Sequence, residues 1–180
     1  MKPTTRNMSV LASLAVVAIL AATHILTGRV DASNCSWPYS GDSVPVEYRW
    51  SPYIKAAWKT AFTSSIGDWN GLETDVTLIH DAYGGLWMGN YNQNDGNYGL
   101  NQNWCSGGDI VDSNNWGNLY YDNHTSNERR SIAGHELGHG LGLHHTGAGQ
   151  LMYTYCCPSS TLYKPNSDDE DDLNDLYDGP

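Results

Sequence analysis

The segment from His135 to His145 has the sequence HELGHGLGLHH. It restricts the structures that this chain can adopt more than any other feature of the sequence. In a helix, His135 and His139 lie four residues apart, so both imidazoles project from the same face. Gly142 can adopt the left-handed conformation that ends a helix and turns the chain back. His145, which follows this turn, can then approach the first two histidines. The segment therefore predicts a helix, a sharp turn and a cluster of three imidazoles.

Such a cluster suits one zinc ion, with His135, His139 and His145 as ligands at about 2.0–2.1 Å. Three protein ligands leave a fourth position for water, which is typical of a catalytic rather than a structural zinc. Glu136 projects about a third of a circle away from His135 and can reach that water without binding the metal. The pattern therefore indicates a catalytic zinc site with Glu136 as its acid–base group.

Two other interpretations of the pattern exist. His144 could replace His145 as the third ligand, although the spacing from Gly142 favours His145. The histidines could also be ordinary core residues, but that interpretation gives the adjacent glutamate no purpose. At ordinary residue frequencies, the whole pattern arises by chance with a probability on the order of one in a hundred thousand.

The pattern resembles the signature of the metzincin metalloproteases, His-Glu-x-x-His-x-x-Gly-x-x-His followed by a methionine-containing turn. Residues 151–153, Leu-Met-Tyr, are similar to that turn, and the resemblance implies that Met152 forms an apolar floor beneath the histidines. Tyr153 directly after the methionine, and the later pair Asp168-Asp169, are closest to the matrixins and to small secreted bacterial (snapalysin-like) members. The similarity covers roughly residues 44–179.

The resemblance implies a zinc-dependent endopeptidase in which Glu136 is the general base for attack of water on a peptide bond. It also implies a twisted, mixed sheet of about five strands with three helices and a zinc cleft between two subdomains. A protein or peptide substrate would lie extended along an edge strand, which we place within residues 98–104. Thr154 stands where some metzincins have a tyrosine ligand, so we expect no tyrosine on the metal.

We expect one catalytic zinc and no second zinc, because the segment that holds a second zinc in matrixins is not found. Calcium at Asn94-Asp95-Gly96-Asn97 is a further candidate, although such a run also fits ordinary turn chemistry. A recognition or adhesion module that keeps zinc only as a scaffold, with the aromatic-rich residues 84–116 as its binding surface, is the alternative function. The retained Glu136 argues against it, because a scaffold needs only the histidines.

Hydrophobic periodicity and turn residues predict an α+β fold. Three helices are expected, and they run from the N-cap Ser51 and Pro52 to Asn70, from the cap at Thr125 to Gly142, and from Asn166 onward. Strands are expected at Val44–Trp50, Asp75–Ile79 and Gly117–Asp122, with loops and short edge strands over residues 84–115.

The N-terminus has the pattern of a secretory signal peptide. Lys2 and Arg6 precede an apolar stretch over residues 8–22, and a small-x-small site predicts cleavage after Ala32. An uncleaved membrane anchor is the alternative, but polar residues interrupt the stretch before the roughly 20 apolar residues that a spanning helix needs. We therefore expect a secreted protein with a catalytic domain at residues 33–180 and no membrane span after cleavage.

Four cysteines lie in this domain: Cys35, Cys105, Cys156 and Cys157. An even number in an exported chain predicts two disulfides, for which three pairings exist. Bridging the two adjacent cysteines strains the ring, so we expect each of them to pair with one of the other two. Zinc binding by these thiols is the alternative, but no Cys-x-x-Cys pair is present.

The net charge of −11 excludes the basic surface that nucleic-acid binding needs. Six of the acidic residues gather in the range 168–175, where they precede and enter the last predicted helix. Negative charge at the N-terminus of a helix is stabilising, so this cluster needs no ligand to explain it. We expect a monomer.

Overall fold

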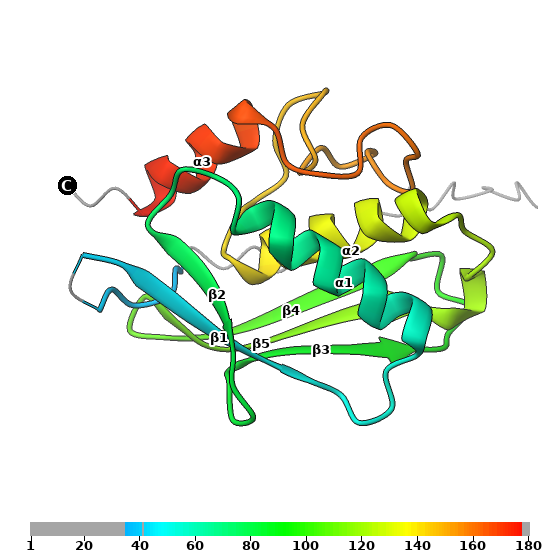
Figure 1. Cartoon of the computed structure of the whole chain (residues 1–180), viewed down its shortest axis with the longest axis horizontal. Coiled ribbons are helices and arrows are strands. Elements are labelled where there is room, and N and C mark those ends of the chain that lie inside the picture. The colour runs from blue at the N-terminus through cyan, green and yellow to red at the C-terminus, as the bar shows by residue number, and fades with distance from the viewer. Residues whose placement is uncertain (1–34, 41, 178–180) are drawn as a thin grey trace, which may run out of the picture.

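The computed structural model describes residues 35–40 and 42–177, which form a five-stranded sheet with three α-helices (Figure 1). The strands are β1 (Val44–Trp50), β2 (Val76–His80), β3 (Leu86–Tyr91), β4 (Gly99–Ser106) and β5 (Asp109–Asn118). The helices are α1 (Ala56–Trp69), α2 (Ser126–Gly140) and α3 (Ser167–Tyr177), with a 3₁₀ turn η1 (Leu119–Tyr121) before α2. The α+β fold predicted from the sequence is confirmed.

The sheet has the order β2-β1-β3-β5-β4. All neighbouring pairs are parallel except β4 with β5, so β4 is an antiparallel edge strand. Its outer edge carries no partner strand within the described residues. The edge strand expected over residues 98–104 therefore exists, with bounds shifted by one or two residues.

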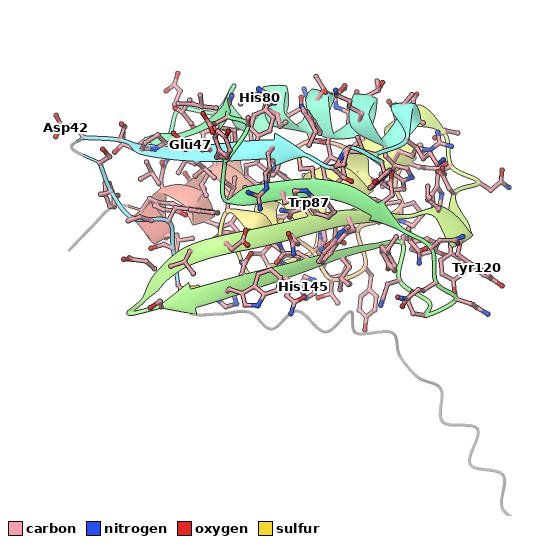
Figure 2. All side chains as sticks on the ribbon, turned by 90° about the horizontal axis from the view of Figure 1, so that it is seen from below. Asp42, Glu47, His80, Trp87, Tyr120 and His145 are labelled. Atoms are coloured by element: carbon pink, nitrogen blue, oxygen red, sulfur yellow. A yellow bond between two sulfur atoms is a disulfide. The ribbon has the colours of Figure 1, made fainter. Side chains whose placement is uncertain are left out.

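The core lies between one face of the sheet and helices α1 and α2, which pack side by side (Figure 1). From α1, Trp58 and Trp69 are almost completely buried, and the Trp69 indole N–H donates to the carbonyl of Gly134 in α2 at 3.1 Å. Gly117 of β5 lies directly beneath Trp58, because an added Cβ would sit 2.2 Å from its ring. Figure 2 shows the opposite face of the sheet, which carries Trp87 and on which none of α1, α2 and α3 packs.

Helix α1 begins later than predicted, at Ala56 instead of Pro52. Ser51 continues the sheet, since its backbone N–H donates to the carbonyl of Met88 at 2.8 Å. Its hydroxyl accepts from the N–H of Tyr53 at 3.2 Å and so caps a turn instead of a helix. The N–H of Lys55 donates to the side chain of Asn90 at 2.7 Å. A residue of β3 therefore accepts the hydrogen bond at the start of the helix.

Strand β5 is longer than the short strands expected there, and residues 119–121 form η1 instead of the middle of a predicted strand. The residues of β5 that point into the core include Ser113 and Asn115, which are fully buried although they are polar. Both hydrogen-bond the side chain of Asn101 on β4, at 3.1 and 2.9 Å. The strand therefore lacks the apolar alternation that sequence analysis relies on.

The expected disulfide pairing was wrong. Cys35 pairs with Cys105, and Cys156 pairs with its neighbour Cys157. Ser36 explains the first pair, because its carbonyl accepts from the N–H of Ile110 at 2.8 Å and brings Cys35 to the β4–β5 hairpin. The adjacent pair lies against α2, next to Ser131 and His135.

None of the helices in the described part of the chain is long and apolar enough to cross a membrane. The predicted signal peptide, residues 1–32, lies outside the described residues.

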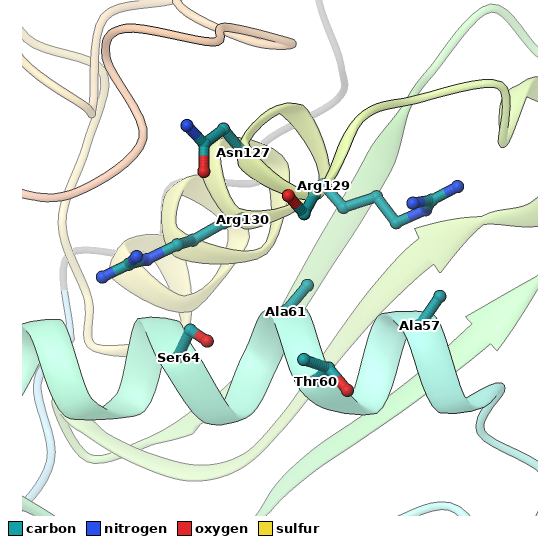
Figure 3. Close-up of a pocket in the computed structure, with 8 residues that line it drawn as sticks. Ala57, Thr60, Ala61, Ser64, Asn127, Arg129 and Arg130 are labelled. Carbon is teal, nitrogen blue, oxygen red and sulfur yellow. The ribbon is translucent and has the colours of Figure 1, made fainter.

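A pocket of about 320 Å³ lies between α1 and the first turns of α2 (Figure 3). Small side chains of α1 form one wall, and the other contains Arg129 and Arg130, which point in opposite directions. Arg129 pairs with Asp122 and Arg130 with Asp68, so both cations already have a carboxylate partner.

Candidate active site

Helix α2 has the boundaries that its sequence predicts. At its start the Thr125 hydroxyl accepts from the N–H of Glu128 at 3.3 Å, and the Glu128 carboxylate accepts from the N–H of Thr125 at 2.7 Å. This reciprocal capping box satisfies two backbone donors. At its end Leu141 is the C-cap, and Gly142 has φ of +100°, the left-handed conformation expected of it.

The turn at Gly142 brings three imidazoles together. The Nε2 atoms of His135 and His139 are 3.1 Å apart, and the Nε2 of His145 lies 3.3 Å from each of them. Bonds of about 2.0–2.1 Å at tetrahedral angles require ligand atoms roughly 3.3–3.4 Å apart, so the three nitrogens fit one zinc ion. Among the described residues they form a group that can hold a metal.

Backbone carbonyls fix the tautomers of two of these rings. The Nδ1 of His135 lies 2.7 Å from the carbonyl oxygen of Leu151, and the Nδ1 of His139 lies 2.8 Å from that of Leu143. A carbonyl can only accept, so each Nδ1 carries the proton. Each Nε2 therefore presents a lone pair to the common centre, as a metal ligand must.

Burial also keeps the three imidazoles neutral. Desolvation lowers the pKa of His135 to about 4, with a smaller contribution from His145. Desolvation lowers the pKa of His139 well below its ordinary value and also lowers that of His145. Near pH 7 the rings are therefore uncharged before any metal binds.

Glu136 lies beside the edge strand. A Cβ added to Gly99, the first residue of β4, would be 2.6 Å from the Glu136 side chain. Burial raises the pKa of Glu136 to about 8, so this carboxyl holds a proton far more readily than an ordinary glutamate. A carboxyl with such a pKa, next to the histidines and to an open strand edge, is suited to accept and return a proton.

Met152 packs against α2 at Gly138, between His135 and His139 in the sequence. It is fully buried, and a Cβ on Gly138 would lie 2.3 Å from its sulfur, so the helix needs a glycine between His135 and His139. Tyr153 is partly buried, and its ring makes an edge-to-face contact with Tyr155.

A buried carboxylate that sequence analysis had not assigned to the site holds this methionine turn. Asp169 of α3 is completely buried and accepts from the backbone N–H groups of Leu151 at 2.9 Å, Met152 at 3.1 Å and Asn166 at 3.0 Å. The sequence does not reveal this role, because Asp169 belongs to a run of acidic residues. Such a run is explained equally well by the stabilising effect of negative charge at the N-terminus of a helix.

We expect Asp169→Asn to lower the free energy of unfolding by about 2–3 kcal/mol, because the amide NH₂ would face a backbone N–H that loses its acceptor. Urea denaturation measures this change. Asp168→Asn is the matched control, since Asp168 is exposed and its charge at the helix start contributes only a few tenths of a kcal/mol. Equal losses in the two variants would contradict the role of Asp169.

His144, the alternative third ligand, is exposed, whereas His145 reaches the other two histidines. The adjacent cysteines also contact α2. The Sγ of Cys156 is 3.2 Å from the Nδ1 of His135, and the Sγ of Cys157 is 3.2 Å from the carbonyl oxygen of Ser131.

In the loop considered for calcium, three oxygens accept hydrogen bonds from a side-chain amide. The side-chain amide of Asn118 donates to the carbonyl oxygens of Gln93 at 2.8 Å and Asn97 at 2.7 Å, and to the carboxylate of Asp95 at 3.1 Å. These oxygens converge on one amide nitrogen, which satisfies them as turn acceptors.

The helix with its three histidines, the left-handed turn and the buried methionine together have the pattern of the metzincin signature. The matrixin family model matches residues 56–178, about two thirds of the chain. The chain belongs to the matrixin family.

No curated protein matches the sequence. The solved structures that match include high choriolytic enzyme 1, a hatching enzyme zinc-protease from the medaka fish Oryzias latipes, with 16% identity and a TM-score of 0.40. The match covers 63% of this chain and 51% of that one, so this chain spans about half the length of that structure.

Proposed function

We propose that the protein is a secreted endopeptidase in which His135, His139 and His145 hold one zinc ion and Glu136 is the general base. The observation that carries this proposal is the convergence of the three Nε2 atoms at 3.1–3.3 Å beside a carboxyl with a raised pKa. The remaining metal position is then left for water.

The bound zinc would polarise the scissile carbonyl and lower the pKa of its water towards about 7. Glu136 takes a proton from this water as its oxygen attacks the peptide carbon, and then delivers the proton to the leaving amine. The outer edge of β4 binds the substrate, because its backbone N–H and C=O groups can pair with an extended peptide. Gly99 permits this strand to lie against Glu136.

Export of residues 33–180 as a monomer after removal of residues 1–32 is part of the proposal. The two disulfides support it, because such bonds persist in oxidising compartments. Calcium at residues 94–97 stays a prediction, which metal analysis of the purified protein can test.

The test of the proposed function begins with the purified mature protein dialysed free of loosely bound metal. We expect about one equivalent of zinc and cleavage of a peptide library, loss of both after chelation, and recovery of cleavage when one equivalent of zinc is returned. Two tightly bound zinc ions, or cleavage that persists without zinc, would show that the proposed site is wrong.

The pKa values predict how many protons zinc displaces at pH 6. Three imidazoles with the ordinary pKa near 6.5 would together carry about two protons, but the lowered pKa values leave His135 and His139 neutral and reduce the charge on His145. We expect the Glu136→Gln variant to release fewer than about one proton per zinc. The parent should release about one more, because the cation drives off the proton that Glu136 holds with its pKa of about 8.

Calorimetric titration in two buffers of different ionisation enthalpy measures these protons. Release of about two protons by the Glu136→Gln variant would mean that the imidazoles are charged before zinc binds.

A further inference from the structure

Three consecutive backbone carbonyls end α2, and the last carbonyls of a helix have no partner within the helix. Each of them accepts a hydrogen bond from a distant side chain. The Asn103 amide donates to the oxygen of His139 at 2.7 Å and the Trp37 indole to that of Gly140 at 2.8 Å. The Tyr177 hydroxyl donates to the oxygen of Leu141 at 2.7 Å.

The three donors come from different parts of the fold. Asn103 belongs to the edge strand β4, Trp37 to the segment before β1, and Tyr177 to the end of α3. Trp37 and Tyr177 are buried, with 8% and 2% of their surface exposed. They are also joined to each other, because the Tyr177 hydroxyl accepts from the backbone N–H of Trp37 at 3.0 Å.

These three hydrogen bonds are made to the segment of chain that connects His139 to His145. The carbonyl of Leu143 accepts from the Nδ1 of His139, and the N–H of Leu143 donates to the carbonyl of Gly138 at 3.0 Å. The same turn continues directly to His145. Any movement of the helix end would therefore change the orientation of one ring and the distance to the other.

We propose that Asn103, Trp37 and Tyr177 are positioning residues that hold the end of α2 so that His139 and His145 meet one zinc ion. The inference rests on the proposed function in one respect, since it takes both histidines as ligands. Three separate elements are tied to one turn, so the metal site is preorganised by the completed fold and not by α2 alone.

Asn103 also connects the metal site to the strand that would bind substrate. Its side chain reaches the helix, while no strand of residues 35–40 and 42–177 pairs with the outer edge of β4. Asn101 steadies this side chain from two residues away, because its side-chain amide donates to the Oδ1 of Asn103 at 3.2 Å. Removing the Asn103 side chain should therefore disturb the metal geometry and leave the peptide-binding edge intact.

The test compares Tyr177→Phe and Asn103→Ala with the parent. Tyr83→Phe and Thr77→Ala are the matched controls, because Tyr83 is 89% exposed and Thr77 is exposed on β2, the strand at the opposite end of the sheet from β4. Three measurements apply: the rate of zinc loss to a chelator, the visible absorption of the cobalt-substituted protein, and kcat and KM on a peptide.

We expect zinc loss to be roughly three- to tenfold faster in both test variants, since each loses about one hydrogen bond at the helix end. The cobalt absorption should shift, and kcat should fall while KM stays near that of the parent. Both controls should match the parent in all three measurements.

Zinc loss at the parent rate with an unchanged cobalt spectrum would overturn the inference, even if the melting temperature falls, because the side chains would then be structural only. If Asn103→Ala does not fold, Tyr177→Phe decides the matter, since it removes a single oxygen. A parent that holds no zinc, or a His139→Ala variant that keeps it, would instead refute the proposed function.

Discussion

Glu136→Gln should retain its zinc and lose peptide hydrolysis by a factor of at least about 10²–10⁴. Glutamine has almost the same shape as glutamate, and the three histidines that would hold the metal are untouched. The amide cannot take a proton from the attacking water, however, and cannot deliver one to the leaving amine. Zinc content and peptidase rate, measured on the same preparation, separate these two effects.

Glu47→Gln is a suitable control for this comparison, since Glu47 is exposed on β1 and the same change of side chain is made far from His145 (Figure 2). It should keep both zinc and activity. Cleavage by Glu136→Gln at the parent rate, with zinc present, would require another base. It would also revive the interpretation of the site as a scaffold within a recognition module.

His139→Ala should lose the metal itself. Removing one of three ligands should weaken zinc binding by more than the 10–100-fold that changes around ligands typically cause. Activity should disappear at the same zinc concentration and return only in part when zinc is added in excess. Competition with a chelating dye measures the affinity.

His144→Ala provides the matched comparison, because it removes an exposed imidazole from the same turn. This variant should bind zinc and cleave peptides like the parent. If His144→Ala lost zinc and His145→Ala kept it, the third ligand would be His144 and not His145.

The features of the site that follow from local sequence were predicted well. The spacing of His135 and His139 sets one helix face, the Thr125 capping box starts that helix, and Gly142 ends it with positive φ. Helix α3 was also placed correctly, because Asn166 caps it through its side chain, which accepts from the N–H groups of residues 168 and 169.

Features that depend on distant contacts were not accessible from the sequence. Ser51 looked like a helix cap but belongs to the sheet, since its N–H meets the carbonyl of Met88. Asp169 looked like surface charge but binds the methionine turn. Each residue has a local explanation that its tertiary partner overrides.

Strand β5 illustrates a second reason why part of the fold could not be predicted from the sequence. Its buried face carries Ser113 and Asn115, which are satisfied by Asn101 across the sheet. A polar side chain can be buried when a neighbouring strand supplies its hydrogen bonds. The periodicity of apolar residues therefore does not predict a strand whose buried side chains are polar and hydrogen-bonded by side-chain amides.

The Cys35–Cys105 disulfide bears on how the protein would respond to the proposed peptidase activity. The bond joins residues 70 positions apart, and the intervening chain includes β1, α1, β2, β3 and most of β4. One cut in any loop of that stretch leaves two fragments covalently linked, so a nicked molecule keeps its mass apart from one added water. Self-digestion there would be invisible on a denaturing gel until a reductant separates the fragments.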